Sequence, residues 1–342
     1  MRISLVFLLL LVLASCAEAP KPNPFTEVSV EVLLEDSVSI RALEIMPGSV
    51  GFAGSGGLFG TYTLSDGRVR TRRQSHEGSH PEFRAVAHTA SDFFMLSAGD
   101  PALLYKTGDA GQLELVYRES GPGVFYDAMA FWDNANGLAV GDARDGCMSI
   151  LITRDGGQTW SRVPCDRLPP ALPGEGAFAA SNTNIALAGT RCWVATTRGR
   201  IFRSNDLGNS WEVIQTPVAH LRDTQGIYSI DFYDAQTGFA IGGDFTQPDE
   251  NTGNKARTSD RGQNWELVAE GSLPGYKSCV RFVPGSGGEG LVAVGFTGIA
   301  YSSDGGRSWQ GLSEESFYTL RFASDSVAYA AGKGRVARLT FR

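Results

Sequence analysis

Apolar residues occur along this chain in short segments separated by turns. Glycine supplies 42 of the 342 residues without a collagen-like period, which is typical of many tight turns between short strands. Near the N-terminus, residues 28–32 (Val-Ser-Val-Glu-Val) alternate between apolar and polar, as a strand with one buried face does. The pattern therefore predicts an all-β fold.

One apolar segment, at the N-terminus, is longer than the others and indicates a signal sequence. Residues 3–13 are apolar except for Ser4, and such a stretch is too short to span a bilayer. It leads into Leu13-Ala14-Ser15-Cys16, which resembles the bacterial lipobox, whose cysteine thiol carries a diacylglycerol after cleavage. A plain secretory signal with an incidental cysteine is the alternative interpretation.

The lipobox interpretation divides the chain into three parts. Residues 1–15 are expected to be a signal peptide, and residues 16–24 a Pro-rich tether that begins with the lipidated Cys16. Residues 25–342 form the folded domain. No later segment has 18 continuous apolar residues, so the lipid is the only expected contact with the membrane. We expect a cell-envelope lipoprotein of the outer membrane, on its periplasmic or surface face.

Four segments of eight residues share one template, with Ser or Thr first, Asp third, Gly fifth and Trp last. They are Thr153–Trp160, Ser204–Trp211, Thr258–Trp265 and Ser302–Trp309. This is the Asp-box, or BNR, pattern, from which only Asn264 departs. A fifth copy keeps Asp109 and Gly111 but has Glu114 in place of the tryptophan.

The residues of the box suit a hairpin turn. The Asp carboxylate can accept hydrogen bonds from the turn, the Gly can take a positive φ, and the Trp can pack between sheets. A carboxylate bound to its own turn is a poor proton donor, so a structural role is expected rather than a catalytic one. The expected structural residues are Asp155, Trp160, Asp206, Trp211, Asp260, Trp265, Asp304 and Trp309.

The spacing of the boxes predicts a β-propeller. Their aspartates follow one another at intervals of 44 to 54 residues, close to the length of a four-stranded blade. The flanking segments give seven units, at residues 39–69, 83–117, 125–163, 176–214, 227–268, 276–312 and 317–341. The seventh has room for three strands, so residues 28–32 are expected to complete it. The prediction is a seven-bladed β-propeller closed by an N-terminal strand pairing with the C-terminal blade.

The boxes are shared with sialidases and other BNR proteins. The whole mature chain resembles the bacterial proteins similar to the photosystem II stability/assembly factor. Local phrases that support this are Gly54-Ser-Gly-Gly57, Glu175-Gly-Ala-Phe-Ala-Ala-Ser181 and Phe239-Ala-Ile-Gly-Gly-Asp244. The resemblance implies a binding or assembly module that holds a protein partner.

A site is expected at one end of the propeller axis, which we call the mouth. Strands that begin at the axis place the loops between blades, and the middle hairpin of each blade, on the face opposite the Asp-boxes. The candidate ligand-binding residues on that face are Arg41, Arg84, Asp100, Tyr126, Asp127, Asp142, Glu175, Tyr228, Asp244 and Lys277. The mixed charge and aromatic character suit a protein partner or a polar or glycan ligand. Alternatively, the three Gly-Asp pairs among them only form turns.

A sialidase-like glycan hydrolase is the alternative function. Such a site needs three arginines, a Tyr–Glu pair and an acidic residue, and Arg41, Arg84 and Arg281 are candidates for the arginines. Residues 40–43 read Ile-Arg-Ala-Leu instead of the family's Phe-Arg-Ile-Pro, and no Tyr–Glu pair is recognisable. No catalytic residue is assigned.

The net charge and the sequence motifs limit which partners and cofactors are expected. The net charge is −7, and we recognise no run of basic residues of the kind that binds phosphate groups. Nucleic acid is therefore not expected as a partner. No dinucleotide-binding glycine pattern or CxxC motif is present, so no cofactor is expected. A monomer is expected.

The cysteines and the possible metal ligands complete the expectations. Cys147 and Cys165 flank the Asp155 turn almost symmetrically and are expected to form a disulfide, while Cys192 and Cys279 stay unpaired. The His76 and His80 pair and the oxygen-rich loop at residues 249–254 are weak metal candidates, and no metal site is assigned.

Overall fold

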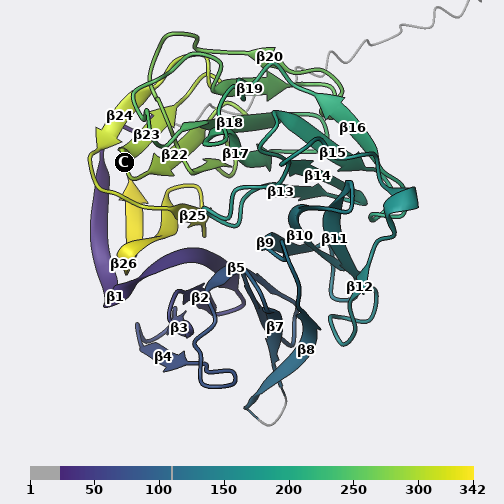
Figure 1. Ribbon diagram of the computed structural model, residues 1–342. Coiled ribbons are helices and arrows are strands. Elements are labelled where there is room, and N and C mark those ends of the chain that lie inside the picture. The colour runs from purple at the N-terminus through teal and green to yellow at the C-terminus, as the bar shows by residue number, and fades with distance from the viewer. Residues whose placement is uncertain (1–23, 109–110) are drawn as a thin grey trace, which may run out of the picture.

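The computed structural model describes residues 24–108 and 111–342. It shows an all-β propeller in which the sheets stand around a central axis (Figure 1). The expected signal peptide, Cys16 and nearly all of the tether lie outside the described residues. Within the described part of the chain, no helix has the length and apolar character needed to cross a membrane.

Five of the sheets have four strands each, in simple antiparallel order. The first contains β5 (Phe83–His88), β6 (Phe93–Ser97), β7 (Ala102–Thr107) and β8 (Leu113–Glu119). The second contains β9 (Tyr126–Phe131), β10 (Gly137–Arg144), β11 (Cys147–Thr153) and β12 (Ser161–Arg162), followed by the short 3-10 helix η1 (Cys165–Arg167). The third contains β13 (Ile185–Ala188), β14 (Arg191–Ala195), β15 (Arg200–Ser204) and β16 (Glu212–Gln215). The fourth contains β17 (Gln225–Phe232), β18 (Gly238–Asp244), β19 (Lys255–Thr258) and β20 (Glu266–Leu267). The fifth contains β21 (Cys279–Phe282), β22 (Leu291–Gly295), β23 (Gly298–Ser302) and β24 (Gln310–Ser313).

The remaining sheet has six strands, and it closes the ring. It contains β25 (Thr319–Phe322), β26 (Val327–Phe341), β1 (Val28–Met46), β2 (Ser49–Gly54), β3 (Leu58–Thr63) and β4 (Val69–Arg73). The first half of β1 pairs with β26 from Val28 opposite Phe341, and its second half pairs with β2. In Figure 1, β1 runs beside β26 and then continues towards β2.

The predicted count of seven blades is wrong, because the described residues form six sheets. The segments assigned to the first and seventh blades are joined edge to edge through β1, which runs without interruption from one to the other. The six-stranded sheet consequently supplies two strands to the axis, β25 and the second half of β1.

The burial pattern follows the order of strands within each sheet. Inner strands such as β17 are buried along their whole length, whereas outer strands such as β4 are exposed at most positions. The hydrophobic core therefore lies between neighbouring sheets rather than at a single centre. Packing of this kind holds the loops at both ends of the axis in fixed positions.

The four Asp-boxes form the expected turns. In the first, Asp155 Oδ1 accepts hydrogen bonds from the Thr159 amide at 3.0 Å and from Thr153 Oγ1 at 2.8 Å. Trp160 Nε1 donates to the Gly157 carbonyl at 3.2 Å, and Gly157 has a φ of +82°. Asp206, Asp260 and Asp304 make equivalent bonds in their own turns. These carboxylates are therefore hydrogen-bonded within their own hairpins.

Each box tryptophan packs towards the preceding sheet. The ring of Trp160 lies 6.4 Å from that of Phe94 in β6, and the ring of Trp309 lies 5.8 Å from that of Phe239 in β18. Trp265 belongs to a core cluster with Trp193 of β14, and Trp211 to one with Ile150 of β11. The box is thus a wedge between neighbouring sheets.

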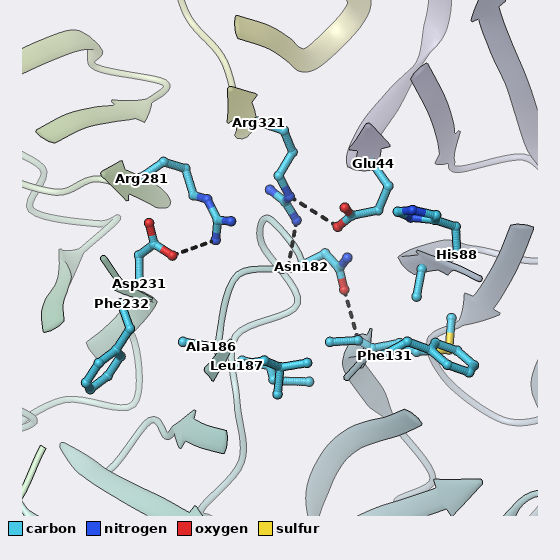
Figure 2. Close-up of a pocket in the computed structure, with 14 residues that line it drawn as sticks. Glu44, His88, Phe131, Asn182, Ala186, Leu187, Asp231, Phe232, Arg281 and Arg321 are labelled. Atoms are coloured by element: carbon cyan, nitrogen blue, oxygen red, sulfur yellow. Dashed lines mark hydrogen bonds and ion pairs between the residues drawn. The ribbon is translucent and has the colours of Figure 1, made fainter. Parts of the chain in front are cut away.

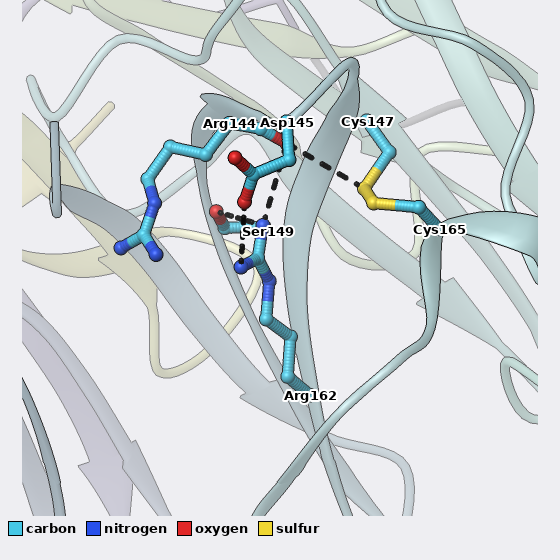
Figure 3. Close-up of a disulfide and its surroundings, with 6 residues drawn as sticks. All are labelled: Arg144, Asp145, Cys147, Ser149, Arg162 and Cys165. Atoms are coloured by element: carbon cyan, nitrogen blue, oxygen red, sulfur yellow. Dashed lines mark hydrogen bonds and ion pairs between the residues drawn. A yellow bond between two sulfur atoms is a disulfide. The ribbon is translucent and has the colours of Figure 1, made fainter.

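Cys147 and Cys165, the pair expected from the sequence, form a disulfide with a Cα–Cα distance of 5.5 Å (Figure 3). Cys165 opens η1 rather than ending a strand, because β12 is only two residues long. Cys192 and Cys279 are buried and unpaired.

Candidate binding surfaces at the two ends of the axis

A buried segment closes the axis of the propeller. Residues 178–184, between the Cys147–Cys165 sheet and β13, run through the centre of the ring, and we call this segment the plug. Its residues Ser181, Asn182, Thr183 and Asn184 are 0–4% exposed. Buried polar side chains of this kind need hydrogen-bond partners.

The plug finds these partners on the inner strands of several sheets. Asn182 Nδ2 donates to the Val86 carbonyl of β5 at 2.7 Å, and the Met129 amide of β9 donates to Asn182 Oδ1 at 2.9 Å. Ser181 Oγ donates to the Ser278 carbonyl at 2.7 Å, and Thr319 Oγ1 of β25 donates to the Ser181 carbonyl at 2.8 Å. The plug therefore divides the axis into two separate ends.

The predicted ligand residues lie at the mouth end, but six of the ten are occupied within the fold. Asp100 accepts a hydrogen bond at 3.1 Å from the Gly121 amide, in the loop between β8 and β9. Tyr126 donates to Glu119 at 2.6 Å, and Tyr228 donates to the Thr224 carbonyl at 2.8 Å. Asp100 therefore bonds to a different loop, whereas Tyr126 and Tyr228 bond to groups a few residues away in sequence.

Glu175, Asp244 and Lys277 are buried in networks of their own. Glu175 is 2% exposed and accepts hydrogen bonds from Nε and Nη2 of Arg200. Asp244 accepts from Arg222 Nε at 2.5 Å. Lys277 Nζ donates to the Gly298 carbonyl at 2.9 Å and to Thr297, and burial lowers the pKa of its ammonium group to about 8. None of these three faces an incoming ligand.

The other four predicted residues, Arg41, Arg84, Asp127 and Asp142, form a charged group below the mouth. The Arg41 guanidinium lies 4.0 Å from the ring centroid of Tyr318, a cation–π contact. Arg84 Nη1 donates to the Ala179 carbonyl of the plug at 3.2 Å. Burial and the neighbouring charge of Arg41 lower the pKa of Arg84.

The pKa values of the two carboxyl groups in this charged group are both raised. Asp127 is fully buried, and among the described residues neither of its carboxylate oxygens has a hydrogen-bond partner. Burial, followed by the charge of Asp142, raises the pKa of Asp127 well above its ordinary value. Burial also raises the pKa of Asp142 to about 6, although its Oδ1 accepts a hydrogen bond from the Ala177 amide at 3.3 Å.

Exposed apolar side chains gather on the same face. In the described part of the chain, eight large apolar residues stand out as exposed, and five of them lie in loops at the mouth end. We call these five the apolar arc: Leu172 (42% exposed), Leu221 (87%), Phe245 (47%), Leu273 (61%) and Phe296 (41%). They come from loops before β13, β17 and β21 and from the hairpins after β18 and β22.

Polar and aromatic contacts join the loops that carry the arc residues. Arg198 bonds both to the Pro173 carbonyl, next to Leu172, and to Asp223, near Leu221. The Arg222–Asp244 ion pair joins the loops of Leu221 and Phe245. Further along, Asn254 donates to the Pro274 carbonyl beside Leu273, and the rings of Tyr276 and Phe296 lie 5.1 Å apart. Exposed apolar side chains gathered on the joined loops of one face are a feature of protein-binding surfaces.

On the Asp-box side, the plug leaves a separate cavity of about 280 Å³ (Figure 2). Arg281 extends into it and pairs with Asp231 at 3.1 Å, and Arg321 pairs with Glu44 at 3.1 Å. Arg321 also donates to the Asn182 carbonyl of the plug at 3.0 Å. Each of these two arginines is paired with a carboxylate of opposite charge, so the cavity is polar and carries little net charge.

The three arginines that the sialidase-like alternative would need do not come together. Arg41 and Arg84 lie on the mouth side of the plug, whereas Arg281 lines the cavity on the other side. Three guanidinium groups that are separated in this way cannot hold one substrate carboxylate.

The metal candidates make other contacts. His76 Nδ1 lies 3.0 Å from the Tyr105 hydroxyl, and His80 Nδ1 lies 2.9 Å from the Gln74 carbonyl. Glu250, in the oxygen-rich loop, bonds to Arg222. In residues 24–108 and 111–342, no group of three or more His, Cys, Asp and Glu side chains is placed to hold a metal ion.

Neither the plug nor the apolar arc is among the features predicted from the sequence. The phrase Glu175–Ser181 leads into the plug, and its continuation through Asn184 is polar although it sits between two strands. The arc residues lie singly in their loops, separated by dozens of residues, so no local pattern connects them.

Comparisons with known proteins agree with this geometry. Residues 151–162 match the model of the BNR/Asp-box repeat family. No curated protein matches the sequence. Among solved structures, YCF48 bound to D1 peptide has a TM-score of 0.65 and 15% identity, over 97% of this chain and 99% of that chain. YCF48 from Cyanidioschyzon merolae has a TM-score of 0.64 and 14% identity, over 92% of this chain and 98% of that one.

Other propellers are similar to this chain at the same level. The structure of U3-55K has a TM-score of 0.63 and 12% identity, over 91% of this chain and 98% of that chain. At such identities the likeness is one of fold. The chain is thus a propeller with BNR/Asp-box repeats whose fold resembles that of YCF48.

Proposed function

We propose that this protein is a membrane-anchored, extracytoplasmic binding module that holds a protein partner at its mouth face. The observation that carries the proposal is the apolar arc, because five exposed apolar side chains on joined loops favour a protein over a small polar ligand. The neighbouring Arg41 and Arg84 add positive charge next to this surface. The fold is compatible with such a role, since YCF48 has been solved bound to a peptide.

The test is capture of a partner from the native envelope by the immobilised mature domain. The variant Leu221→Asp/Leu273→Asp places two charges in the arc, where both side chains are exposed and the fold does not need them. The matched control is Val32→Asp/Leu64→Asp, which changes two other exposed apolar residues away from the mouth. We expect wild type and control to retain the same proteins and the arc variant to lose them. Equal retention by all three would contradict the proposal.

The membrane anchor is a separate part of the proposal and rests on the Leu13-Ala14-Ser15-Cys16 sequence. Cys16→Ala should abolish labelling with a palmitate analogue and release the domain from membranes. Persistent labelling of that variant would contradict lipidation at this residue. The binding proposal does not depend on this result, because the capture experiment uses the folded domain.

A further inference from the structure

The degenerate fifth box leaves a groove between two neighbouring sheets. A cavity of about 280 Å³ lies between the β3–β4 strands of the six-stranded sheet and the β7–β8 hairpin. The side chains of Phe59, Phe93 and Leu113 line it, and Arg70 and Arg72 stand at its edge. Figure 1 shows these two hairpins as neighbours in the ring.

The four complete boxes show what normally occupies such a position. Each inserts its own tryptophan towards the preceding sheet, as Trp160 does against Phe94 and Trp309 against Phe239. In each, the indole Nε1 donates to the carbonyl of the box glycine. The gap between the sheets is thereby filled by an aromatic ring from within the chain.

The fifth hairpin cannot fill its gap in this way. The tryptophan position is Glu114, which is half-exposed and pairs with Lys106 at 3.5 Å. In the β7–β8 register, Thr107, the first residue of this box, pairs with Leu113, its seventh. Thr107 Oγ1 donates to Asp92 at 3.4 Å. An apolar groove therefore remains where the other boxes place an indole.

The edge of the groove is strongly basic. The β3–β4 register places Arg72 opposite Phe59 and Arg70 opposite Thr61, so both arginines stand on the face that borders the groove. With Arg68 and Arg73 they make four arginines in six residues, on a chain whose net charge is −7. These arginines form a basic run, contrary to the expectation from the sequence that none is present.

Only some of the arginines in this cluster have a partner within the described residues. Arg73 is bound to Asp36 at 2.9 Å, and Arg72 donates to the Gly111 carbonyl at 3.4 Å. Among the described residues, Arg70 makes no ion pair. Charged residues on an edge strand can discourage pairing with other chains, but that role does not explain an apolar, aromatic-lined groove beside them.

We propose that this groove binds an aromatic side chain, with tryptophan the best fit, carried on an acidic segment of a partner protein. The ring would occupy the place that the chain's own tryptophan has in the complete boxes, between Phe59 and Phe93. Carboxylates on either side would pair with Arg70 and Arg72, which also lie where a guanidinium can contact the ring. This surface is separate from the mouth and does not depend on the function proposed there.

The first test uses peptides and the wild-type protein. An acetylated, fluorescein-labelled peptide of sequence Gly-Glu-Asp-Trp-Asp-Glu-Gly is titrated with the protein and followed by fluorescence polarisation. Two further peptides replace the tryptophan with alanine or the four acidic residues with lysine. We expect each replacement to weaken binding about tenfold or more, which corresponds to about 1.4 kcal/mol. Equal binding of the tryptophan and alanine peptides would overturn the proposal, as would stronger binding of a thymidine oligonucleotide.

The second test fills the groove from within. The variant Leu113→Ser/Glu114→Trp restores the box sequence, so its own indole should occupy the groove, raise the melting temperature and abolish peptide binding. Arg70→Glu/Arg72→Glu should also abolish binding. The control Arg167→Glu/Arg342→Glu makes the same change of net charge at exposed arginines outside the groove and should bind normally. Normal binding by a folded Arg70→Glu/Arg72→Glu variant, or by a restored-box variant with a raised melting temperature, would place the peptide elsewhere and refute the proposal.

Discussion

The plug gives the most direct prediction of stability, through Asn182. Its side chain bridges β5 and β9 by bonds of 2.7 and 2.9 Å, and the residue is 4% exposed. The change Asn182→Ala leaves the Val86 carbonyl and the Met129 amide without partners in a buried place. Each unsatisfied group costs about 1–3 kcal/mol. We therefore expect the free energy of unfolding to fall by about 2–5 kcal/mol.

Urea denaturation followed by tryptophan fluorescence measures this change. The melting temperature should fall by at least about 4 °C, since about 1 kcal/mol shifts it by about 2–4 °C in domains approaching this size. The control Asn134→Ala removes one hydrogen bond, from the Ala90 amide, at an exposed site. That control should cost less than about 1 kcal/mol. If both variants lose the same free energy of unfolding, the hydrogen bonds of Asn182 do not stabilise the fold as proposed.

Three further predictions concern stability. Glu175→Ala leaves Arg200 buried without its partner, so it should cost about 3–5 kcal/mol in urea denaturation, whereas a residue that only bound ligand would cost little. Because burial raises the pKa of Asp142 to about 6, the stabilisation from its protonated form is complete below its ordinary pKa and is lost as the pH rises through about 6. Asp142→Asn should accordingly be more stable than wild type by about 1–3 kcal/mol at about pH 8 and equal to it in acid; a difference that does not change with pH would contradict this reasoning. Cys147→Ser/Cys165→Ser should lower the free energy of unfolding by about 2–4 kcal/mol by calorimetry, and a reductant should have no effect on that variant.

The sequence predicts the all-β propeller with its Asp-boxes well because the signals are local. In each box, Asp, Gly and Trp bond within a span of eight residues, so the spacing alone reveals the turn. The count of blades depends instead on which distant strands pair. Only the structure shows that β1 pairs with β26 along its first half and with β2 along its second half.

The candidate site was harder to predict, because a loop position does not reveal burial. The sequence makes Glu175 a candidate ligand residue, yet its partner Arg200 lies 25 residues away and takes the carboxylate out of reach of a ligand. Lys277 is likewise held by Thr297 and Gly298. The working surface depends on which side chains stay exposed, and that follows from packing between sheets.

The most direct test of the central claim is site-specific photo-crosslinking in the native cell envelope. A benzophenone amino acid is placed at Phe245 or Phe296 in the apolar arc, and at Arg307 on the Asp-box face, where the side chain is 60% exposed. If the mouth face holds a protein partner, the two arc positions will give the same crosslinked adduct and Arg307 will give none. An adduct at Arg307, with none at Phe245 and Phe296, would contradict the account.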